Sequence, residues 1–247
     1  MKRVTPKTLG CMSDEWDKVS PVRQKIIDEN KDTSLINTTA PAILQEVTKT
    51  LPNTILDVGC GTGYLTHRMA NYTKKCVGID ASKNSIELAR MRYSADNLSF
   101  VHSAIEKLEL GMKFALCVAN MVFSCDPNWI ASVKHIYDLM DSNGRFLIML
   151  PHPCFWASYW GIQEEPWFCY DEEIYIEHDF SISCAKDLGR ATYIHRPIST
   201  YINGLISCGF VVTELQELAA DNVNPYHFFL LIKCKKSENT DKGPVAK

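Results

Sequence analysis

Positions 55 to 63 read Ile55-Leu56-Asp57-Val58-Gly59-Cys60-Gly61-Thr62-Gly63, a hydrophobic run that leads into a glycine-rich turn. A helical pattern follows directly after this turn. Glycine is needed where a backbone turns tightly and lets a ligand approach the main chain. We therefore predict a buried strand, a ligand-binding turn and a helix in succession.

A carboxylate stands at the end of the next predicted strand, where Cys76-Val77-Gly78-Ile79 is followed by Asp80. An acid at this place, one strand-helix unit beyond the glycine turn, can accept hydrogen bonds from a ribose diol. The turn and the acid together predict a nucleoside-bearing cofactor. A dinucleotide is one candidate, although its loop normally reads G-x-G-x-x-G, whereas the spacing here is G-x-G-x-G.

Short β-rich runs alternate with helical stretches from residue 54 onward, which is typical of a parallel sheet covered by helices. The predicted strands are 54–58, 75–79, 98–101, 114–119 and 144–150, and the helices between them are 63–72, 83–93 and 129–140. A last helix at 198–207 precedes two strands, 209–214 and 226–234, which should pair as an antiparallel hairpin. We predict a Rossmann-like α/β fold with a seven-stranded sheet, five strands parallel and two in the hairpin, and helices on both faces.

The remaining segments suggest how the chain is organised around this fold. Residues 1–50 read as an N-terminal helical leader, 51–234 as the main domain and the polar stretch 235–247 as a disordered tail. The insertion 154–196 is rich in aromatic residues. That composition suits a lid over a small apolar acceptor, and it equally suits a self-packed cap or a dimer contact.

Charge and cysteine usage narrow the function classes. The net charge of −3, from 26 basic and 29 acidic residues, offers no basic field for nucleic acid. The longest apolar runs, 146–150 and 228–232, are far too short to span a membrane. The ten cysteines contain no C-x-x-C pair, so we expect neither a metal site nor a disulfide framework. No secretory signal is visible, and we predict a cytoplasmic protein that is a monomer or a homodimer.

The glycine turn, with Asp57 two residues ahead of its first glycine, resembles the class I S-adenosylmethionine-dependent methyltransferases. The resemblance runs from about residue 55 to 150 and continues more weakly to 234. It implies S-adenosylmethionine as cofactor and a methyltransferase domain over 51–234. Asp57 would lie near the amino-acid end of the cofactor, where an acid suits an ammonium group. The residues Trp16 and Arg23 occupy the place where such enzymes often fold a helix over the cofactor.

The resemblance also implies further cofactor contacts. Gly59, Cys60 and Gly61 would run along the methionine portion, Asp80 would hold the ribose and Ala81 would pack near the adenine. The segment Ser103-Ala104-Ile105 aligns with the family's adenine-binding stretch, but Ser103 stands where an aspartate is commonest. A serine can still accept a hydrogen bond there. Asn120, after the fourth strand, would lie beside the transferable methyl group.

Methyl transfer is an in-line displacement, so the protein must supply alignment and, for a hydroxyl acceptor, removal of a proton. His152 is the candidate base, because it directly follows the fifth strand, although it could simply pack between Pro151 and Pro153. His178 and His195 have weaker positional arguments. We predict methyl transfer to oxygen or nitrogen of a small-molecule acceptor. A non-catalytic cofactor-binding protein of the same fold and a dinucleotide-dependent enzyme are the alternatives.

Overall fold

The computed structural model describes residues 1–180, 189–219 and 227–237. The main sheet is built from β2 (Thr54–Val58), β3 (Lys75–Asp80), β4 (Leu98–His102), β5 (Phe114–Asn120), β6 (Met140–Pro151), β9 (Phe210–Leu218) and β10 (Phe229–Lys236). Their order across the sheet is β4-β3-β2-β5-β6-β10-β9. Strands β2 to β6 pair in parallel. β10 runs antiparallel to both β6 and β9, so the predicted fold class is confirmed.

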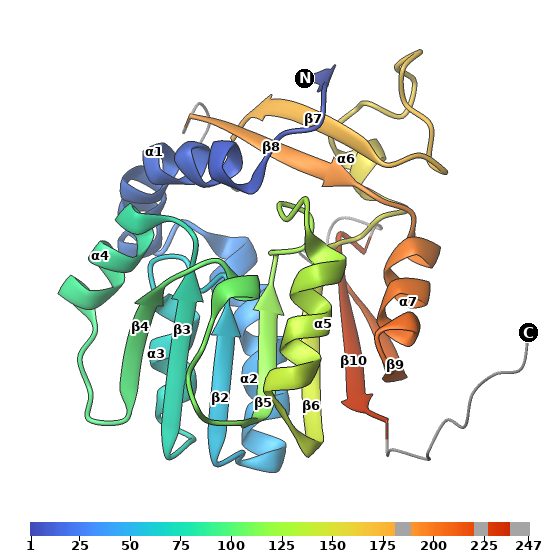
Figure 1. The fold of residues 1–247 in the computed structure, drawn as a ribbon. Helices are drawn as coiled ribbons and strands as arrows, with labels where there is room; N and C mark the ends of the chain where they lie inside the picture. The colour runs from blue at the N-terminus through green and yellow to red at the C-terminus, as the bar shows by residue number, and fades with distance from the viewer. Residues whose placement is uncertain (181–188, 220–226, 238–247) are drawn as a thin grey trace, which may run out of the picture.

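Helices cover both faces of this sheet (Figure 1). The covering helices are α2 (Ala40–Thr50), α3 (Tyr64–Ala70), α4 (Lys83–Arg92), α5 (Trp129–Leu139) and α7 (Ile198–Ser207). α5 and α7 lie in front of the sheet in Figure 1, and α2 and α3 lie behind it. Side chains of a strand alternate between its faces. Ile55 therefore joins the core under α2 and α3, while Leu56 joins the core under α5.

The N-terminal fifty residues are more varied than the predicted helical leader. The long helix α1 (Leu9–Asp28) is followed by a π-helical turn η1 (Ser34–Thr39) and then by α2. Ile43 and Val47 of α2 are fully buried against the main sheet. Helix α2 therefore belongs to the core of the main domain, although the sequence analysis placed the start of that domain at residue 51. Residues 2 to 4 form a strand, β1 (Lys2–Val4), rather than a helix.

The aromatic insertion folds into a second, smaller sheet above the main one. β7 (Ile174–Asp179) pairs antiparallel with β8 (Arg190–His195) and with β1. A short helix, α6 (Trp156–Tyr159), packs beside them. We call β1, α6, β7 and β8 the cap. Three residues are too few to show a strand pattern in sequence, so β1 is evident only from its pairing with β7.

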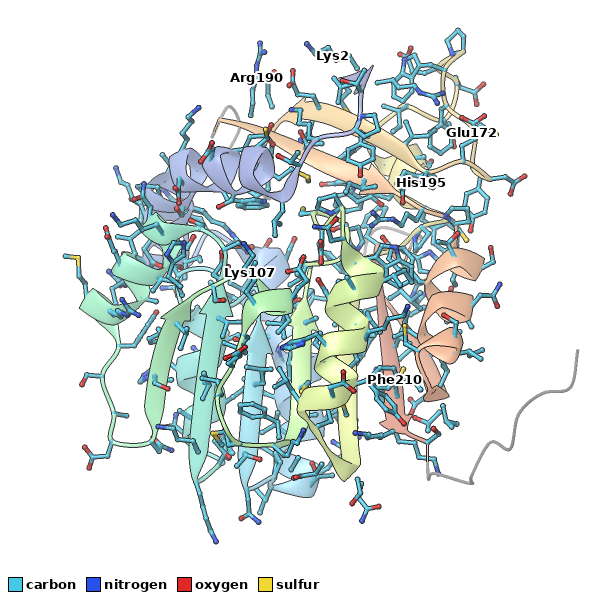
Figure 2. The ribbon with its side chains drawn as sticks, viewed as in Figure 1. Lys2, Lys107, Glu172, Arg190, His195 and Phe210 are labelled. Carbon is cyan, nitrogen blue, oxygen red and sulfur yellow. The ribbon has the colours of Figure 1, made fainter. Side chains whose placement is uncertain are left out.

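Ion pairs connect the three strands at the outer side of the cap. Glu177 of β7 contacts Lys2 of β1 at 3.0 Å and Arg190 of β8 at 3.4 Å. Figure 2 shows Lys2 and Arg190 at this outer side of the molecule, while His195 lies nearer the main domain. The side chains of these ion pairs therefore lie on the outer side of the cap, away from the side chains that face the main domain.

The C-terminal boundary differs slightly from the prediction. β10 continues through Lys236, whose Nζ donates to the carbonyl oxygens of Tyr137 at 2.8 Å and Met140 at 3.2 Å. The first two residues of the predicted 235–247 tail are therefore ordered strand. Residues 238–247 of that tail lie outside the described residues, as does Tyr226, the predicted start of the last strand. None of the helices in the described ranges is long and apolar enough to cross a bilayer.

A buried guanidinium joins the cap to the main domain. The Arg196 side chain is fully buried just after β8. It donates to the carbonyl oxygens of Phe123 at 2.6 Å and Asp126 at 3.0 Å, both in the loop between β5 and α5. Its Nε pairs with the Glu173 carboxylate, and its charge lies 5.7 Å from the Trp129 ring centroid. These contacts fix where the cap meets the strand ends.

We expect Arg196→Met to destabilise the protein by about 3 kcal/mol, because a buried carbonyl left without a donor costs about 1–3 kcal/mol. Urea denaturation followed by circular dichroism measures the change. Arg190→Met is the matched control, since the Arg190 side chain is 68% exposed and its surface pairs contribute little. Equal stability of the two variants would contradict the anchoring role of Arg196.

Candidate functional site

A cavity of about 260 Å³ opens at the carboxyl ends of β2, β3, β4 and β5. α1 lies along one side of it, and the cap lies above it (Figure 1). The carboxyl ends of parallel strands are where open α/β sheets bind ligands. Residues predicted to bind a nucleoside and residues of the aromatic insertion line this one cavity together.

The glycine turn after β2 forms part of the cavity floor. Gly59 and Gly61 both have left-handed backbone conformations, with φ of 63° and 54°. A Cβ on Gly59 would lie 2.4 Å from the Val122 side chain, so packing requires glycine there. A Cβ on Gly61 would meet only an Arg23 nitrogen at 4.0 Å, so this glycine leaves open space for a ligand.

Asp80, at the end of β3, is hydrogen-bonded to the glycine turn. Its Oδ2 accepts from the Gly61 amide at 2.8 Å, and its Oδ1 accepts from the Ser82 amide at 2.8 Å. Each carboxylate oxygen keeps a further lone pair, so both can also accept from ribose hydroxyls. Burial raises the pKa of Asp80, while the two backbone amides oppose that rise.

The predicted adenine-side residues line the same cavity. They are Ala81, Ser103, Ala104 and Ile105. The Ser103 hydroxyl donates to the Ala104 carbonyl at 2.8 Å, and the Ser103 amide donates to the Asp80 carbonyl at 3.1 Å. With its proton occupied, the Ser103 hydroxyl is available to a ligand only as an acceptor.

Helix α1 is fastened to the loop after β3 by hydrogen bonds that sequence analysis missed. Asp17 Oδ1 accepts from the Ser82 hydroxyl at 2.5 Å and from the Asn84 amide at 3.0 Å. The Ser13 hydroxyl donates to the Ala81 carbonyl at 2.7 Å. Ser13 and Asp17 are four residues apart, which places them on one face of a helix. The spacing of four could have shown from the sequence that the two side chains share a face of the helix. It could not have shown that this face binds the loop after β3.

The methionine end of the predicted cofactor site is a smaller hollow of about 40 Å³ that adjoins the cavity. Asp57 and Cys60, which do not line the main cavity, line this hollow together with Gly61 and Asn120. Asp57 accepts from the Thr66 hydroxyl at 2.6 Å. Burial raises the pKa of Asp57 to about 7. A cationic ligand group placed here would favour its ionised form.

Three polar atoms in this region are buried without hydrogen-bond partners. They are Asn120 Oδ1, Arg23 Nε and Asp32 Oδ2. Arg23 reaches over the turn from α1, and its guanidinium forms an ion pair with Asp32 at 3.6 Å. Buried polar groups normally have hydrogen-bond partners. The unpaired Asn120 oxygen and Arg23 Nε fit a ligand that brings both a hydrogen-bond donor and an anionic group, as the amino-acid end of S-adenosylmethionine does.

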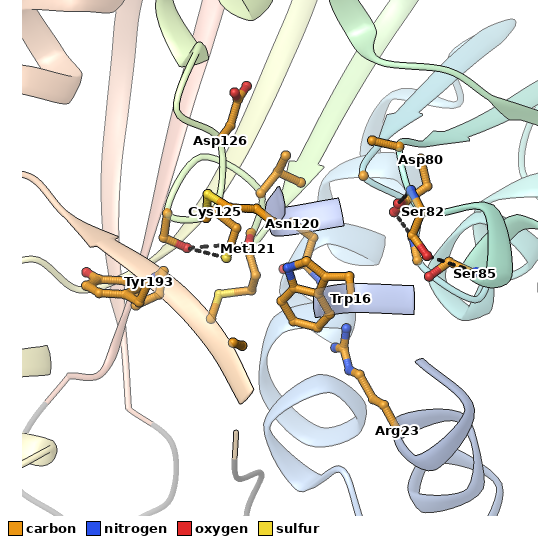
Figure 3. Close-up of a pocket in the computed structure, with 18 of the residues that line it drawn as sticks. Trp16, Arg23, Asp80, Ser82, Ser85, Asn120, Met121, Cys125, Asp126 and Tyr193 are labelled. Carbon is orange, nitrogen blue, oxygen red and sulfur yellow. Dashed lines mark hydrogen bonds between the residues drawn. The ribbon is translucent and has the colours of Figure 1, made fainter. Parts of the chain in front are cut away.

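The other end of the cavity is aromatic. Its lining residues are Trp16 of α1, Trp156 of α6, Trp160 directly after α6, and His178 and Tyr193 of the cap sheet. Figure 3 shows Asp80, Ser82 and Ser85 on one side of Trp16 and Asn120, and Met121, Cys125 and Tyr193 on the other. The cavity therefore has a polar end that suits a nucleoside and an apolar end that suits a second molecule.

The described residues contain neither a disulfide nor a cluster of side chains arranged to hold a metal ion. Nine cysteines are described, and all of them are free thiols. Cys184 lies outside the described ranges. Burial raises the pKa of Cys125, which lines the cavity, to about 11, so it is a neutral thiol. Across the described residues, no group of His, Cys, Asp or Glu side chains is arranged to hold a metal ion.

His152, the sequence candidate for a catalytic base, does not line the cavity. It is 2% exposed and lies under Phe155, with ring centroids 4.6 Å apart. Its Nδ1 accepts from the Cys154 amide at 3.2 Å, which leaves Nε2 to donate to Glu217 at 2.9 Å. Both ring nitrogens are used, so neither has a lone pair free for proton transfer. This geometry favours the packing alternative, and we do not assign a base role to His152.

We expect His152→Ala to lower stability by about 2 kcal/mol, because it leaves a buried amide without its acceptor. Cofactor affinity should be unchanged. Thermal melting and calorimetry with S-adenosylhomocysteine measure the two quantities. Glu217→Gln, which retains an acceptor for Nε2, is the control and should lose less. A variant that folds with full stability yet loses turnover would restore His152 as the base.

Comparison with known proteins agrees with this geometry. Residues 52–172 match the family model described as a methyltransferase domain. The malonyl-[acyl-carrier protein] O-methyltransferase of Acetivibrio thermocellus is 35% identical over 92 residues, which cover 36% of this chain and 32% of that protein. The matches to such curated relatives span about a third of the relatives' own length.

Solved structures share the fold over a larger part of the chain. A putative S-adenosylmethionine-dependent methyltransferase from Listeria monocytogenes is 23% identical with a TM-score of 0.65, covering 81% of this chain and 98% of that one. The N-methyltransferase NodS from Bradyrhizobium japonicum is 14% identical with a TM-score of 0.56, covering 81% and 94%. With the glycine turn, the strand order and the family match in agreement, this chain carries a class I S-adenosylmethionine-dependent methyltransferase domain.

Proposed function

We propose that this chain transfers the methyl group of S-adenosylmethionine to oxygen or nitrogen of a small molecule bound under the cap. The proposal rests on a cavity that is lined at one end by Gly61 and Asp80 and at the other end by the aromatic residues of the cap. A cofactor and an acceptor can therefore meet inside it, which is what direct transfer between two bound molecules requires.

The cofactor would lie with its adenosine toward Asp80 and its amino-acid end toward the glycine turn. Asp80 would accept from the ribose hydroxyls, and Ala81, Ser103, Ala104 and Ile105 would surround the base. Asn120 Oδ1 is the unpaired acceptor for an ammonium proton, and Arg23 is the cation for the carboxylate. S-adenosylmethionine supplies an electrophilic methyl group on a sulfonium. The protein's own contribution is orientation and exclusion of water.

The two alternative functions from the sequence differ in what supports them. A dinucleotide cofactor is not supported, since residues 52–172 match a methyltransferase domain and structurally similar methyltransferases bind S-adenosylmethionine. A non-catalytic member of the same fold differs from an enzyme only in turnover, so a methyl-transfer assay distinguishes them. The cytoplasmic location, the absence of a nucleic-acid partner and the monomeric or dimeric state stay predictions from sequence.

We expect Asp80→Ala to weaken binding of S-adenosylhomocysteine by about 100-fold or more. Each hydrogen bond to a charged group is worth about 1.5–3 kcal/mol, and two ribose hydroxyls are involved. Isothermal titration calorimetry measures the affinity. Asp96→Ala removes the same charge from an exposed loop residue and should bind as the unaltered protein does. Retained affinity in Asp80→Ala would remove the ribose assignment.

Binding should also release protons from Asp57. Because its pKa is about 7 in the free protein, the carboxyl is about half protonated at pH 7, and a neighbouring ammonium group lowers the pKa. We expect release of about half a proton per S-adenosylhomocysteine bound at pH 7, relative to the Asp57→Asn variant. Calorimetry in buffers of different ionisation enthalpy measures it. Identical proton release in both proteins would show that the ammonium group binds elsewhere.

A further inference from the structure

Three histidines lie in or next to the cap, and they differ in what their ring nitrogens can do. His152 uses both nitrogens, as described above. His195 is 1% exposed, and its Nε2 bonds the Tyr170 carbonyl at 2.9 Å. His178 is the one of the three that lines the cavity. Its position therefore allows contact with a bound molecule, which the other two positions do not.

The tautomer of His178 is fixed by the backbone. Its Nδ1 lies 3.2 Å from the carbonyl oxygen of Asp179. A carbonyl oxygen only accepts, so Nδ1 carries the proton and Nε2 carries the lone pair. No described residue forms a hydrogen bond with Nε2. The imidazole thus offers an unused basic nitrogen at the cavity wall.

Neighbouring aromatic rings hold the imidazole in place. The Trp160 ring centroid is 4.2 Å from that of His178, and the Phe180 centroid is 6.2 Å away. Ala191 pairs with His178 across the cap sheet, so a small residue faces it. Burial lowers the pKa of His178, which keeps the ring neutral and able to take a proton at pH 7.

We infer that His178 is the general base of this enzyme and that the acceptor is an uncharged aromatic molecule bearing a phenol-type hydroxyl. The inference rests on the proposed methyltransferase function and specifies its acceptor. A neutral imidazole with a free lone pair, positioned at the aromatic end of the cavity, is of use to a hydroxyl acceptor. A carboxylate or an unprotonated amine already has a free electron pair and needs no base.

The charges of the cavity disfavour an anionic acceptor. Its described charged lining residues are Asp32, Asp80, Glu106, Asp126 and Arg23. Arg23 is the one cation of this set, and its guanidinium lies between the glycine turn and the Trp16 ring, whose centroid is 5.9 Å away. An anionic acceptor beside Trp160 and Tyr193 would meet no other described lysine or arginine of the cavity lining, and burying an unpaired charge is costly. An uncharged ring can stack on the tryptophans instead.

Methyl transfer from S-adenosylmethionine to the acceptor hydroxyl needs no further reactant. The acceptor O–H bond breaks and its proton moves to His178 Nε2, while the oxygen forms a bond to the methyl carbon. The bond from that carbon to sulfur breaks, and its electron pair stays on sulfur. The imidazolium then loses the proton to solvent. General bases of this kind contribute typically 100-fold to 10,000-fold to rate.

The direct test uses two histidine variants and three acceptors. His178→Asn keeps a donor at the Nδ1 position and removes the basic nitrogen, and His195→Gln keeps the donor to Tyr170 as a matched control. The acceptors are 2-naphthol, 2-naphthylamine and 2-naphthoate, which share one ring system. We expect methylation of the naphthol, a loss of about 100-fold or more in turnover in His178→Asn, and little loss in His195→Gln. Preference for the amine or carboxylate, or an active His178→Asn variant, would overturn the inference.

The pH profile provides a readout that a structural role would not change. The charged groups facing His178 are Asp179 on its own strand, Glu15 on α1 and the chain's amino terminus. Arg190 pairs with Asp179 across the cap sheet, with its Nε 3.8 Å from the Asp179 carboxylate. Turnover should rise with pH as the imidazole loses its proton, below its ordinary pKa of 6.5, and stay level above pH 7. In His178→Asn the rate should instead follow ionisation of the naphthol.

A binding measurement covers the case in which none of the three acceptors is methylated. In protein loaded with S-adenosylhomocysteine, ¹⁵N resonances of the imidazole report the tautomer and its ligand contacts. We expect a protonated Nδ1, and a shift of Nε2 on addition of 2-naphthol but not of 2-naphthoate. A protonated Nε2, or no response to the naphthol, would overturn the inference. Failure to bind S-adenosylhomocysteine at all would instead overturn the proposed function.

Discussion

The hydrogen bond from the Gly61 amide to the Asp80 carboxylate, 2.8 Å long, ties together the ends of β2 and β3. It brings the glycine turn and the ribose-binding acid into one site, although they lie on separate strand-helix units. A parallel sheet makes this possible because its strands all end at the same edge. The two backbone amides thereby hold the partly buried carboxylate in one orientation, which is preorganisation of the site.

Helix α1 extends that organisation to the cap. Near its middle, Asp17 bonds the loop after β3. Glu15, two residues earlier, pairs with Lys7 at 2.5 Å and accepts from Thr192 of β8 at 3.1 Å. One helix therefore contacts both the nucleoside end and the roof of the acceptor end. The cap is in turn fixed to the loop after β5 through the buried Arg196. Cofactor and acceptor regions are parts of one connected structure.

The five parallel strands, the terminal hairpin, both covering layers and the glycine turn could be predicted because each rests on local patterning or on spacing within one strand-helix unit. Long-range contacts could not. The pairing of β1 with β7, and the bonds from α1 to Ser82, join residues far apart in sequence and leave no periodic signal. For the same reason the sequence favours His152 over His178 as the catalytic base. Its place after a predicted strand was visible in sequence, whereas only the fold shows that its nitrogens are used and that His178 faces the cavity.

The fold suggests that one cavity holds the cofactor with its sulfur directed toward the aromatic end. A crystal structure of the chain with S-adenosylhomocysteine would show this arrangement. We expect ribose hydroxyls within hydrogen-bond distance of Asp80, the amino-acid end beside Asn120 and Arg23, and the sulfur facing the space under His178 and Trp160. A ligand bound outside this cavity, or with its sulfur turned away from the cap, would rule out transfer within the cavity.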